Sequence, residues 1–501
     1  MVRFVLDGEV IEVADADPTR TVLQFLREDL CRIGTKEGCA EGDCGACTVA
    51  LVEIAPDGER LQVRALNSCI QFLPTLDGKE LITVESLRGA DGTLHPVQQA
   101  MVDCHGSQCG FCTPGFVMSM FALYKNNACP GRREIDDALA GNLCRCTGYS
   151  PIVKAAGEMY RLGSARAKGE SWLLAPHGSQ AAVDADEKGR VAMLRSIRRA
   201  GTLRVAAEGR QFQAPETLDE LARLAEEEPD ATLLAGGTDV GLWVTKQLQE
   251  LQTVIYTGRV EELKRLTVTK THIDIGAAVS LTDAMPVLVA HYPEVEQVLL
   301  RFASPPIRNA GTLGGNVANG SPIGDTMPAL LALDATLVLR KGRDTRELPL
   351  TKFYLDYRKT ALARGELLER VLIPLPQPGA HLRTYKVSKR FDQDISAVCG
   401  AYWLKLDDAT IAGIRIAYGG LAAVPKRAMH CEQALLGSAW NEAAVQDAMS
   451  ALDADFKPIA DMRSSAAYRR RICRNLLHRF YLELSGAVET TVYDYGRQKL
   501  A

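Results

Sequence analysis

The stretch that decides the fold of the first part of the chain is residues 37–48, Glu-Gly-Cys-Ala-Glu-Gly-Asp-Cys-Gly-Ala-Cys-Thr. Cys39, Cys44 and Cys47 stand in it with four and then two residues between them, and Cys69 follows downstream. Eleven of the fourteen cysteines lie before residue 147. This clustering favours metal ligands over disulfides, which would be spread more widely.

The spacing C-x4-C-x2-C with a distant fourth cysteine is the plant-type ferredoxin pattern, in which four thiolates hold a [2Fe-2S] cluster. Glycines let such a loop wrap closely and turn its N–H groups toward the sulfurs, which raises the reduction potential. The loop carries Gly38, Gly42 and Gly45. A structural zinc site or a group of inert thiols is the alternative, and spacing and glycines together favour the cluster.

A second set of cysteines is Cys109 and Cys112, separated by two residues, and Cys144 and Cys146, separated by one. C-x2-C by itself also occurs in zinc sites and redox disulfides. The C-x-C pair precedes a helix-like segment, where the helix dipole stabilises thiolate charge. Spacing alone leaves zinc open; the neighbouring ferredoxin-type site favours a second [2Fe-2S] cluster, because two adjacent clusters make an electron path.

The periodicity predicts a multidomain α+β protein whose first two domains carry these sets. A hairpin over 2–13, a helix over 17–30 capped by Asp17, and strands at 48–54 and 61–66 indicate a ferredoxin-like β-grasp domain over 1–76. Helix-like stretches predict a helical-bundle [2Fe-2S] domain over 77–163, with Thr113 as one N-cap; they are 95–105, 114–125, 132–141 and 151–162.

The rear of the chain has a different character. Residues 164–204 lack clear periodicity and are expected to be a linker. An α/β region follows, with glycine-rich loops at 233–241 and 311–325, and Pro374–Gly379 indicates a further boundary. The loops offer free N–H groups for a pyrophosphate, but ordinary strand–helix turns explain them equally well. The last part mixes strands (398–405, 412–418) with helices (439–453, 464–484).

Composition excludes some classes of function. The 501 residues are 47% apolar and 24% charged with a net charge of -4, so no nucleic-acid partner is expected. We expect no signal peptide and no membrane span, and a cytoplasmic location. Six further cysteines are expected to be buried free thiols: Cys31, Cys104, Cys129, Cys399, Cys431 and Cys473.

Three motifs together resemble the molybdenum hydroxylase (xanthine oxidase) family: residues 37–48, Gln108–Gly115 and Asn142–Tyr149. One departure is Ser150, where many members carry a basic residue, and no ligand is affected. The resemblance implies that the second cluster lies nearer a molybdopterin on another chain, and that Gln108 and Cys146 approach this pterin. The first cluster would then lie between the second cluster and a flavin.

The resemblance extends to the rear, which is similar to the family's two-lobed α/β FAD-binding domain (205–376) and its C-terminal α+β flavoprotein domain (377–501). It implies that the first loop holds the FAD phosphates through Leu234, Gly236, Gly237, Thr238, Asp239 and Val240. Thr312, Asn316 and Asp325 would hold the rest of the dinucleotide. Further implied contacts are Leu368, Lys386, the flavin-stacking Phe302, and Tyr357 on the nicotinamide approach; Lys389–Ile395 resembles a charged loop near the flavin.

Two clusters and FAD in one chain imply an electron-transfer subunit that reduces NAD+, in a reaction that converts hypoxanthine and xanthine to urate. The substrate chemistry would belong to a molybdopterin-binding large subunit, in an α2β2 assembly. No residue of this chain is therefore expected to be catalytic, and His95, His105 and His177 are expected to be ordinary core or surface histidines.

Two alternatives remain open. The first keeps the family but changes the chemistry to oxidation of an aldehyde or another N-heterocycle, with oxygen or a quinone as acceptor. The second is a binding module whose degenerate cofactor sites serve only assembly or redox sensing. Complete ligand sets argue against the second alternative, and the electron acceptor separates the first from NAD+ reduction.

Overall fold

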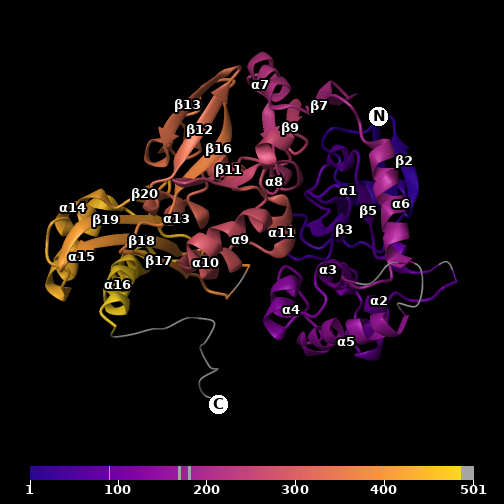
Figure 1. The fold of residues 1–501 in the computed structure, drawn as a ribbon, viewed down its shortest axis with the longest axis horizontal. Coiled ribbons are helices and arrows are strands. Elements are labelled where there is room, and N and C mark those ends of the chain that lie inside the picture. Colours follow the sequence, from indigo (N-terminus) through magenta and orange to yellow (C-terminus); the bar gives the residue numbers. More distant parts are fainter. Residues whose placement is uncertain (90, 167–170, 179–181, 392, 487–501) are drawn as a thin grey trace.

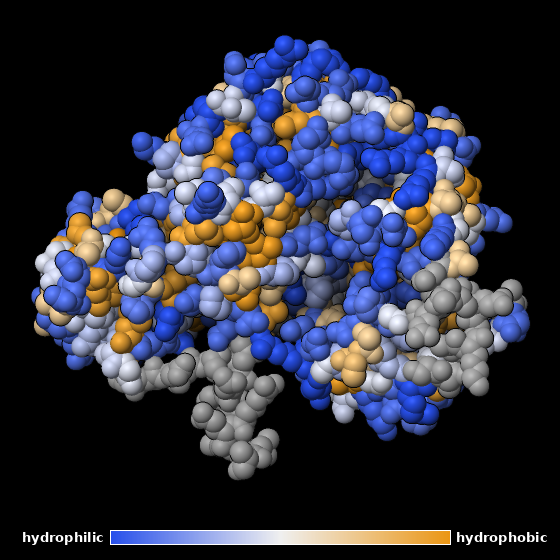
Figure 2. All heavy atoms as spheres, viewed as in Figure 1, coloured by the Kyte–Doolittle hydropathy of each residue, from blue (hydrophilic) through white to orange (hydrophobic). Residues whose placement is uncertain are grey.

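The computed structural model describes residues 1–89, 91–166, 171–178, 182–391 and 393–486. Figure 1 shows three parts side by side: the segments of the first 166 residues on one flank, residues 203–376 in the centre, and residues 380–484 on the other flank. Figure 2 shows that the surface is hollowed between the centre and the first part. Within the described residues, no helix combines the length and apolar character needed to cross a membrane.

The first sheet belongs to the unit expected to be ferredoxin-like and extends beyond its expected boundary. Its five strands are ordered β2-β1-β5-β3-β4, with β1 and β5 parallel and the other pairs antiparallel. The expected boundary at residue 76 is wrong, because β5 lies between β1 and β3, and without it the sheet would separate into two hairpins. We call residues 1–82 the ferredoxin unit; its strands are β1 (Val2–Leu6), β2 (Glu9–Val13), β3 (Thr48–Ile54), β4 (Leu61–Asn67) and β5 (Glu80–Ile82).

The helix expected over 17–30 is shorter and begins later. Thr21 is the N-cap: its side chain accepts from the Gln24 N–H, and the Gln24 side chain accepts from the Thr21 N–H in a capping box. Asp17 instead accepts from the Thr19 N–H at 2.8 Å, which forms a turn. The helix α1 (Val22–Gln24) then continues as a π-helical turn over Phe25–Asp29.

The helical unit (residues 83–166) matches the expected bundle closely. Thr113 is not an N-cap, however: Cys112 occupies that position, and the Thr113 hydroxyl donates to Ser107 Oγ at 2.8 Å. His95 is buried and caps its helix by accepting from the Val97 N–H, so its expected structural role is confirmed. The helices are α2 (Pro96–Asp103), α3 (Thr113–Asn126), α4 (Arg132–Leu139) and α5 (Ser150–Arg166).

The expectation of an irregular linker over 164–204 is wrong, because this segment contains a helix, α6 (Ala182–Ile197). Leu194 and Ile197 pack against Val5 of the ferredoxin unit. Arg190 pairs with Glu80 at 2.5 Å and Arg199 with Asp77 at 3.1 Å. Residues 182–199 therefore form a packed arm that holds the ferredoxin unit, with α6 lying against β1 and β3; Figure 1 shows α6 on this flank of the molecule.

The central region has two lobes, as expected. The first lobe is a sheet ordered β6-β7-β9-β8, in which β7, β9 and β8 run parallel; the second is an antiparallel sheet ordered β10-β11-β16-β12-β13. The first lobe contains β6 (Leu203–Ala207), β7 (Arg210–Ala214), α7 (Leu218–Glu227), β8 (Thr232–Leu234), α8 (Val240–Thr245) and β9 (Thr253–Tyr256). The second contains β10 (Leu266–Val268), β11 (His272–Gly276), α9 (Leu281–His291), α10 (Glu296–Leu300), α11 (Pro305–Ala310), α12 (Leu313–Asn319), α13 (Thr326–Ala332), β12 (Thr336–Lys341), β13 (Asp344–Pro349) and β16 (Leu367–Pro374), with a small hairpin of β14 (Tyr354–Asp356) and β15 (Lys359–Thr360).

The C-terminal region is an antiparallel sheet covered by helices, which confirms the expected α+β character. Tyr402 and Tyr418 lie fully buried in its core, and the Tyr402 hydroxyl donates to the Tyr418 hydroxyl, which donates to the Cys473 carbonyl at 2.8 Å. Each buried hydroxyl therefore has a partner. The elements are β17 (Ala380–Val387), β18 (Val398–Asp407), β19 (Thr410–Gly419), β20 (Lys426–Arg427), α14 (Met429–Leu435), α15 (Glu442–Asp455) and α16 (Ala466–Leu484).

Candidate cofactor sites

The first cysteine loop turns backbone N–H groups toward a sulfur, as its glycines predict. The N–H groups of Glu41 and Cys44 both donate to Cys39 Sγ, each at 3.4 Å. The side-chain amide of Asn67 lies 3.8 Å from Cys47 Sγ. Donors aimed at the sulfurs stabilise thiolate charge, which a cluster ligand must carry.

The four thiols of this set are close enough to share protons. Hydrogen bonding from Cys44 lowers the pKa of Cys39, and hydrogen bonding from Cys69 lowers the pKa of Cys47. The same contacts with Cys39 raise the pKa of Cys44 and of Cys69. Four thiolates cannot coexist here without positive charge between them, and the iron of a cluster supplies that charge.

Neighbouring atoms approach the backbone of this loop so closely that only glycine fits at two positions. A Cβ at Gly38 would lie 2.7 Å from Cys44 Sγ, inside the space of the sulfur. Gly45 has φ +70, and a Cβ there would lie 2.1 Å from the Gly141 carbonyl oxygen of the helical unit. The loop is therefore enclosed on both sides, as a cluster-binding loop must be.

The second set associates in pairs, Cys109 with Cys146 and Cys112 with Cys144. Burial raises the pKa of Cys112 to about 12, and Cys144 Sγ lies 3.2 Å from the Thr147 hydroxyl. Among the described residues, no three His, Cys, Asp or Glu side chains converge as the ligands of a single metal ion would. Paired thiols fit a [2Fe-2S] cluster, which takes two ligands per iron, better than the zinc alternative.

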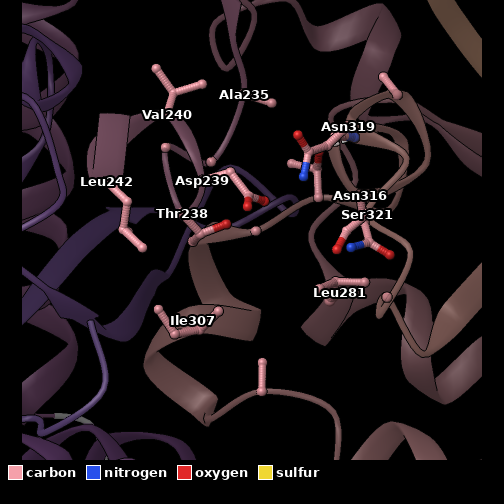
Figure 3. A pocket seen from close by; sticks show the side chains of 18 of the residues that line it. Ala235, Thr238, Asp239, Val240, Leu242, Leu281, Ile307, Asn316, Asn319 and Ser321 are labelled. Carbon is pink, nitrogen blue, oxygen red and sulfur yellow. Dashed lines mark hydrogen bonds between the residues drawn. The ribbon is translucent and has the colours of Figure 1, made fainter. Parts of the chain in front are cut away.

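A cavity of about 1100 Å³ lies between the lobes and the C-terminal region. Figure 3 shows Thr238 and Asp239 of the first glycine-rich loop and Asn319 of α12 turned toward the same space. Asp239 opens onto the cavity yet is enclosed by protein, and this desolvation raises the pKa of its carboxyl. Eleven expected FAD contacts line the cavity: Gly236, Gly237, Thr238, Asp239, Val240, Phe302, Thr312, Asn316, Asp325, Leu368 and Lys386.

Two expected contacts lie elsewhere. The Leu234 side chain is buried in the core shared with the ferredoxin unit, and its carbonyl accepts from the Thr257 N–H at 2.8 Å. The Tyr357 side chain is 57% exposed and stands outside the cavity wall, to which Arg358 and Thr360 contribute instead. The side chain of Leu234 therefore cannot contact a ligand in the cavity.

The floor of the cavity consists of backbone segments that lie in close contact with one another. A Cβ at Gly236 would lie 2.0 Å from the Ala310 carbonyl oxygen, and one at Gly314 would lie 2.4 Å from the Ala277 Cα. Gly237 has φ +74, a left-handed conformation that glycine adopts without strain. The two glycine-rich loops thus meet backbone against backbone at the floor of the cavity.

An ion pair is buried at the far wall. Lys386 Nζ lies 2.6 Å from Asp325 Oδ2, and both side chains are 2% exposed. Ser396 donates to the other carboxylate oxygen at 2.6 Å, and Lys386 also donates to the Arg301 carbonyl at 2.9 Å. With every partner satisfied, the pair gives the wall a fixed polar surface.

The first cysteine loop touches both other sites. The hydroxyl of Thr245 in α8 donates to the Ala40 carbonyl at 2.8 Å, and Glu41 and Asp43 line the cavity. On the opposite side, the Leu143 N–H, one residue before Cys144, donates to the Cys44 carbonyl at 3.0 Å. The three sites are therefore arranged in series, with the first cysteine set in the middle.

Comparison with known families matches four segments of the chain. Residues 4–72 match a 2Fe-2S iron–sulfur cluster binding domain and residues 83–157 a [2Fe-2S] binding domain. Residues 207–376 match the FAD binding domain in molybdopterin dehydrogenase, and residues 383–484 the CO dehydrogenase flavoprotein C-terminal domain. The chain belongs to the molybdenum hydroxylase family. It carries the family's iron–sulfur and FAD-binding electron-transfer portion.

Individual relatives agree with this placement. The xanthine dehydrogenase of Emericella nidulans is 33% identical over 543 residues, which cover 100% of this chain and 40% of the relative. Aldehyde oxidase 2 of Macaca fascicularis is 31% identical, with 96% of this chain and 39% of the relative covered. A carbon monoxide dehydrogenase structure from Hydrogenophaga pseudoflava is 28% identical with a TM-score of 0.51, covering 54% of this chain and 94% of that chain. The chain thus spans about 40% of the length of these curated relatives.

Several residues of the cavity wall were not predicted from the sequence motifs of this molybdenum hydroxylase chain. Asn319 and Ser321 lie within the second glycine-rich loop, so their position could have indicated them. Gln393 lies within the charged loop that the resemblance did indicate, whereas Met462 and Arg463 come from the turn before α16. No motif marks that turn, because only tertiary folding brings it to the cavity.

Cys31 and Cys129 are exposed, whereas the sequence led us to expect buried thiols at both positions.

Proposed function

We propose that the chain is the electron-transfer subunit of a xanthine dehydrogenase. It would pass electrons from a partner molybdopterin subunit to NAD+ during oxidation of hypoxanthine and xanthine to urate. The observation that carries the proposal is the serial arrangement: the Cys39–Cys47 loop contacts the Cys144 segment on one side and the FAD-site cavity on the other. When bound, the clusters carry single electrons and the flavin exchanges two electrons with NAD+ as a hydride.

We assign the first cluster to Cys39, Cys44, Cys47 and Cys69 and the second to Cys109, Cys112, Cys144 and Cys146. The N–H groups on Cys39 Sγ support the first assignment and the two thiol pairs support the second. Thiolates are the ligands that iron–sulfur clusters require. The chain's task at both sites is to hold the ligand sulfurs and exclude water.

At the FAD site, the paired glycine-rich loops would bind the pyrophosphate through backbone N–H groups, and Thr238 would add a hydroxyl. Phe302 lines the cavity, where its aromatic ring would stack on the isoalloxazine. The Asp325–Lys386 pair would present fixed polar groups to the rest of the dinucleotide. Tyr357, exposed next to Arg358, would meet the nicotinamide on its approach.

The surface at the second cysteine set supports a protein partner that holds molybdopterin. Cys109 and Cys146 are exposed, as is Gln108. Three large apolar side chains are exposed beside them: Phe111 (47%), Leu143 (42%) and Tyr149 (40%). Apolar surface of this kind marks interaction sites. We propose that the molybdopterin subunit covers it, with Gln108 and Cys146 facing the pterin, in an α2β2 assembly.

A second candidate is the equivalent subunit of an enzyme that oxidises an aldehyde or another N-heterocycle and passes electrons to oxygen or a quinone. The observation that favours it is the relative named aldehyde oxidase 2, nearly as similar as the xanthine dehydrogenases. The two candidates share the cluster and FAD sites and differ in substrate and acceptor.

The test has two stages. The purified chain should show flavin bleaching when NADH is added without oxygen. Absence of bleaching by NADH, together with recovery of the flavin colour when a quinone is added to the chemically reduced chain, would favour the second candidate. Co-purification with the molybdopterin partner should then give NAD+ reduction that depends on xanthine. A colourless protein without iron would overturn both candidates and leave a binding module.

A further inference from the structure

Residues 389–390 and 393–395 of the C-terminal region line the cavity and reach the first cysteine loop. Arg301 Nε donates to the Phe391 carbonyl at 2.7 Å, and Arg390 Nη2 donates to the Gln393 carbonyl at 2.6 Å. The Asp394 carboxylate accepts from the Arg390 N–H at 2.8 Å. Gln393 itself has φ +46, an uncommon left-handed conformation for a residue other than glycine, and these contacts hold it there.

The Gln393 side chain ties two units together. Its Nε2 donates to the Asp43 carbonyl oxygen at 2.8 Å, and its Oε1 accepts from the Gly141 N–H of the helical unit. The orientation of the amide follows from the partners, because a carbonyl accepts only and an N–H donates only. The Asp43 carbonyl belongs to the same peptide group as the Cys44 N–H, which donates to Cys39 Sγ.

The other N–H group that donates to Cys39 Sγ belongs to a peptide whose carbonyl also accepts a side-chain hydrogen bond. The Glu41 N–H donates to Cys39 Sγ, and the carbonyl of that peptide group, Ala40, accepts from the Thr245 hydroxyl at 2.8 Å. The hydroxyl has only one hydrogen, and its other neighbour, the Gly241 carbonyl, is farther at 3.1 Å. Two peptide groups donate their N–H to Cys39 Sγ, and the carbonyl of each accepts a hydrogen bond from a side chain outside the ferredoxin unit. These side chains, Thr245 and Gln393, belong to the central and C-terminal regions, which we call together the flavin-binding part.

We propose that Thr245 and Gln393 are positioning residues through which the flavin-binding part sets the reduction potential of the first cluster. A hydrogen bond to a peptide carbonyl polarises that peptide and strengthens the bond its N–H donates. Stronger N–H···S bonds stabilise the more negatively charged, reduced cluster and raise its potential. The inference rests on the proposed assignment of Cys39 as a ligand of that cluster.

The test is a redox titration of the full chain, in which electron paramagnetic resonance follows each cluster separately. Thr245→Val removes a donor while keeping the shape, and Thr245→Ser keeps the donor. Gln393→Met keeps the length without the amide. We expect Thr245→Val and Gln393→Met each to lower the reduced-to-oxidised ratio of the first cluster at a fixed potential, by at most about fivefold, the value for complete loss of one neutral N–H···S bond. Thr245→Ser should match the wild type, and the second cluster should not change.

Two further measurements separate the possible failures. Faster hydrogen exchange at the amides of Glu41 and Cys44 in the same variants would report the loosened N–H···S bonds without any activity assay. An unchanged first-cluster potential in both variants, with full iron and flavin content, overturns the inference. Retention of both cluster signals in Cys39→Ser would instead overturn the ligand assignment on which it rests.

Discussion

Gln71 Nε2 donates to the Gly236 carbonyl oxygen at 2.9 Å and joins the segment after Cys69 to the glycine-rich loop of the FAD-site cavity. Beside this bond, Ile70 packs directly on α8, where Gly241 stands. A cysteine of the first set and the cavity wall are therefore separated by only two residues of chain and one hydrogen bond. Electron transfer between the two sites would cross this contact.

Gly241→Ala should disturb that contact. A Cβ at residue 241 would lie 2.6 Å from the Ile70 carbonyl oxygen and 2.8 Å from its Cβ, and neither atom can move freely. Overpacking of this kind costs about 1–3 kcal/mol. We expect a lower melting temperature and slower electron transfer from reduced flavin to the first cluster in stopped-flow spectra. Gly157→Ala is the control, because no atom lies within 4 Å of its Cβ; an equal loss in both variants would contradict the explanation.

Single cysteine substitutions should remove one cluster at a time. Cys69→Ser is expected to abolish the signal of the first cluster and Cys144→Ser that of the second, with bound iron falling by about half in each, since a [2Fe-2S] cluster needs four ligands. Iron analysis and electron paramagnetic resonance measure both effects. Cys129→Ser, an exposed thiol outside both sets, is the matched control and should keep all iron. Loss of both clusters in one variant with an intact fold would contradict separate sites.

The sites that could be predicted are those whose ligands stand close together in the chain. The spacing of Cys39, Cys44 and Cys47 indicated the first loop, and the glycines at 236 and 237 indicated the cavity floor. Thr245 and Gln393 could not be found in this way, because each donates to a backbone carbonyl far away in the chain and such a contact requires no particular residue pattern.

Two errors in the fold have physical reasons as well. The apolar stripe of α6 is narrow, Val191, Leu194 and Ile197, on an otherwise charged helix, so the segment reads as linker although that stripe is buried. The strand β5 has only three residues, Glu80–Ile82, and pairs with strands more than twenty-five residues away. Short strands made by distant pairing give no periodic signal.

Removing the Lys386 ammonium should leave a buried carboxylate without its partner. Asp325 Oδ2 lies 2.6 Å from Lys386 Nζ, and both side chains are almost inaccessible to solvent. Breaking such a pair typically costs about 3–5 kcal/mol. We expect Lys386→Met to lower the melting temperature and the flavin content, measured from absorbance after gel filtration. Lys270→Met at an exposed position should change neither, and normal flavin content in Lys386→Met would contradict a role at the FAD site.

The ion pair of Glu53 and Lys79, on the ferredoxin unit, should give a pH-dependent stability. Burial raises the pKa of Glu53, but the Lys79 ammonium 3.1 Å away outweighs it, and the pKa falls from 4.5 to about 2. Between these two values the unfolded chain binds a proton that the native chain does not bind. The contribution of Glu53 to stability is therefore complete above about pH 4.5 and is lost as the pH falls toward 2.

Lys79→Met should weaken this dependence, because burial then acts on Glu53 with its nearest cation removed and only Lys264 and Arg64 still lower its pKa. The native pKa of Glu53 in the variant would lie closer to its unfolded value, so the variant would lose less stability as the pH falls. We expect the melting temperature of the variant to lie below that of the wild type at about pH 6, and the gap to narrow by about pH 3, measured by circular dichroism. A gap that stays constant over this range would show that Glu53 is not held ionised by Lys79.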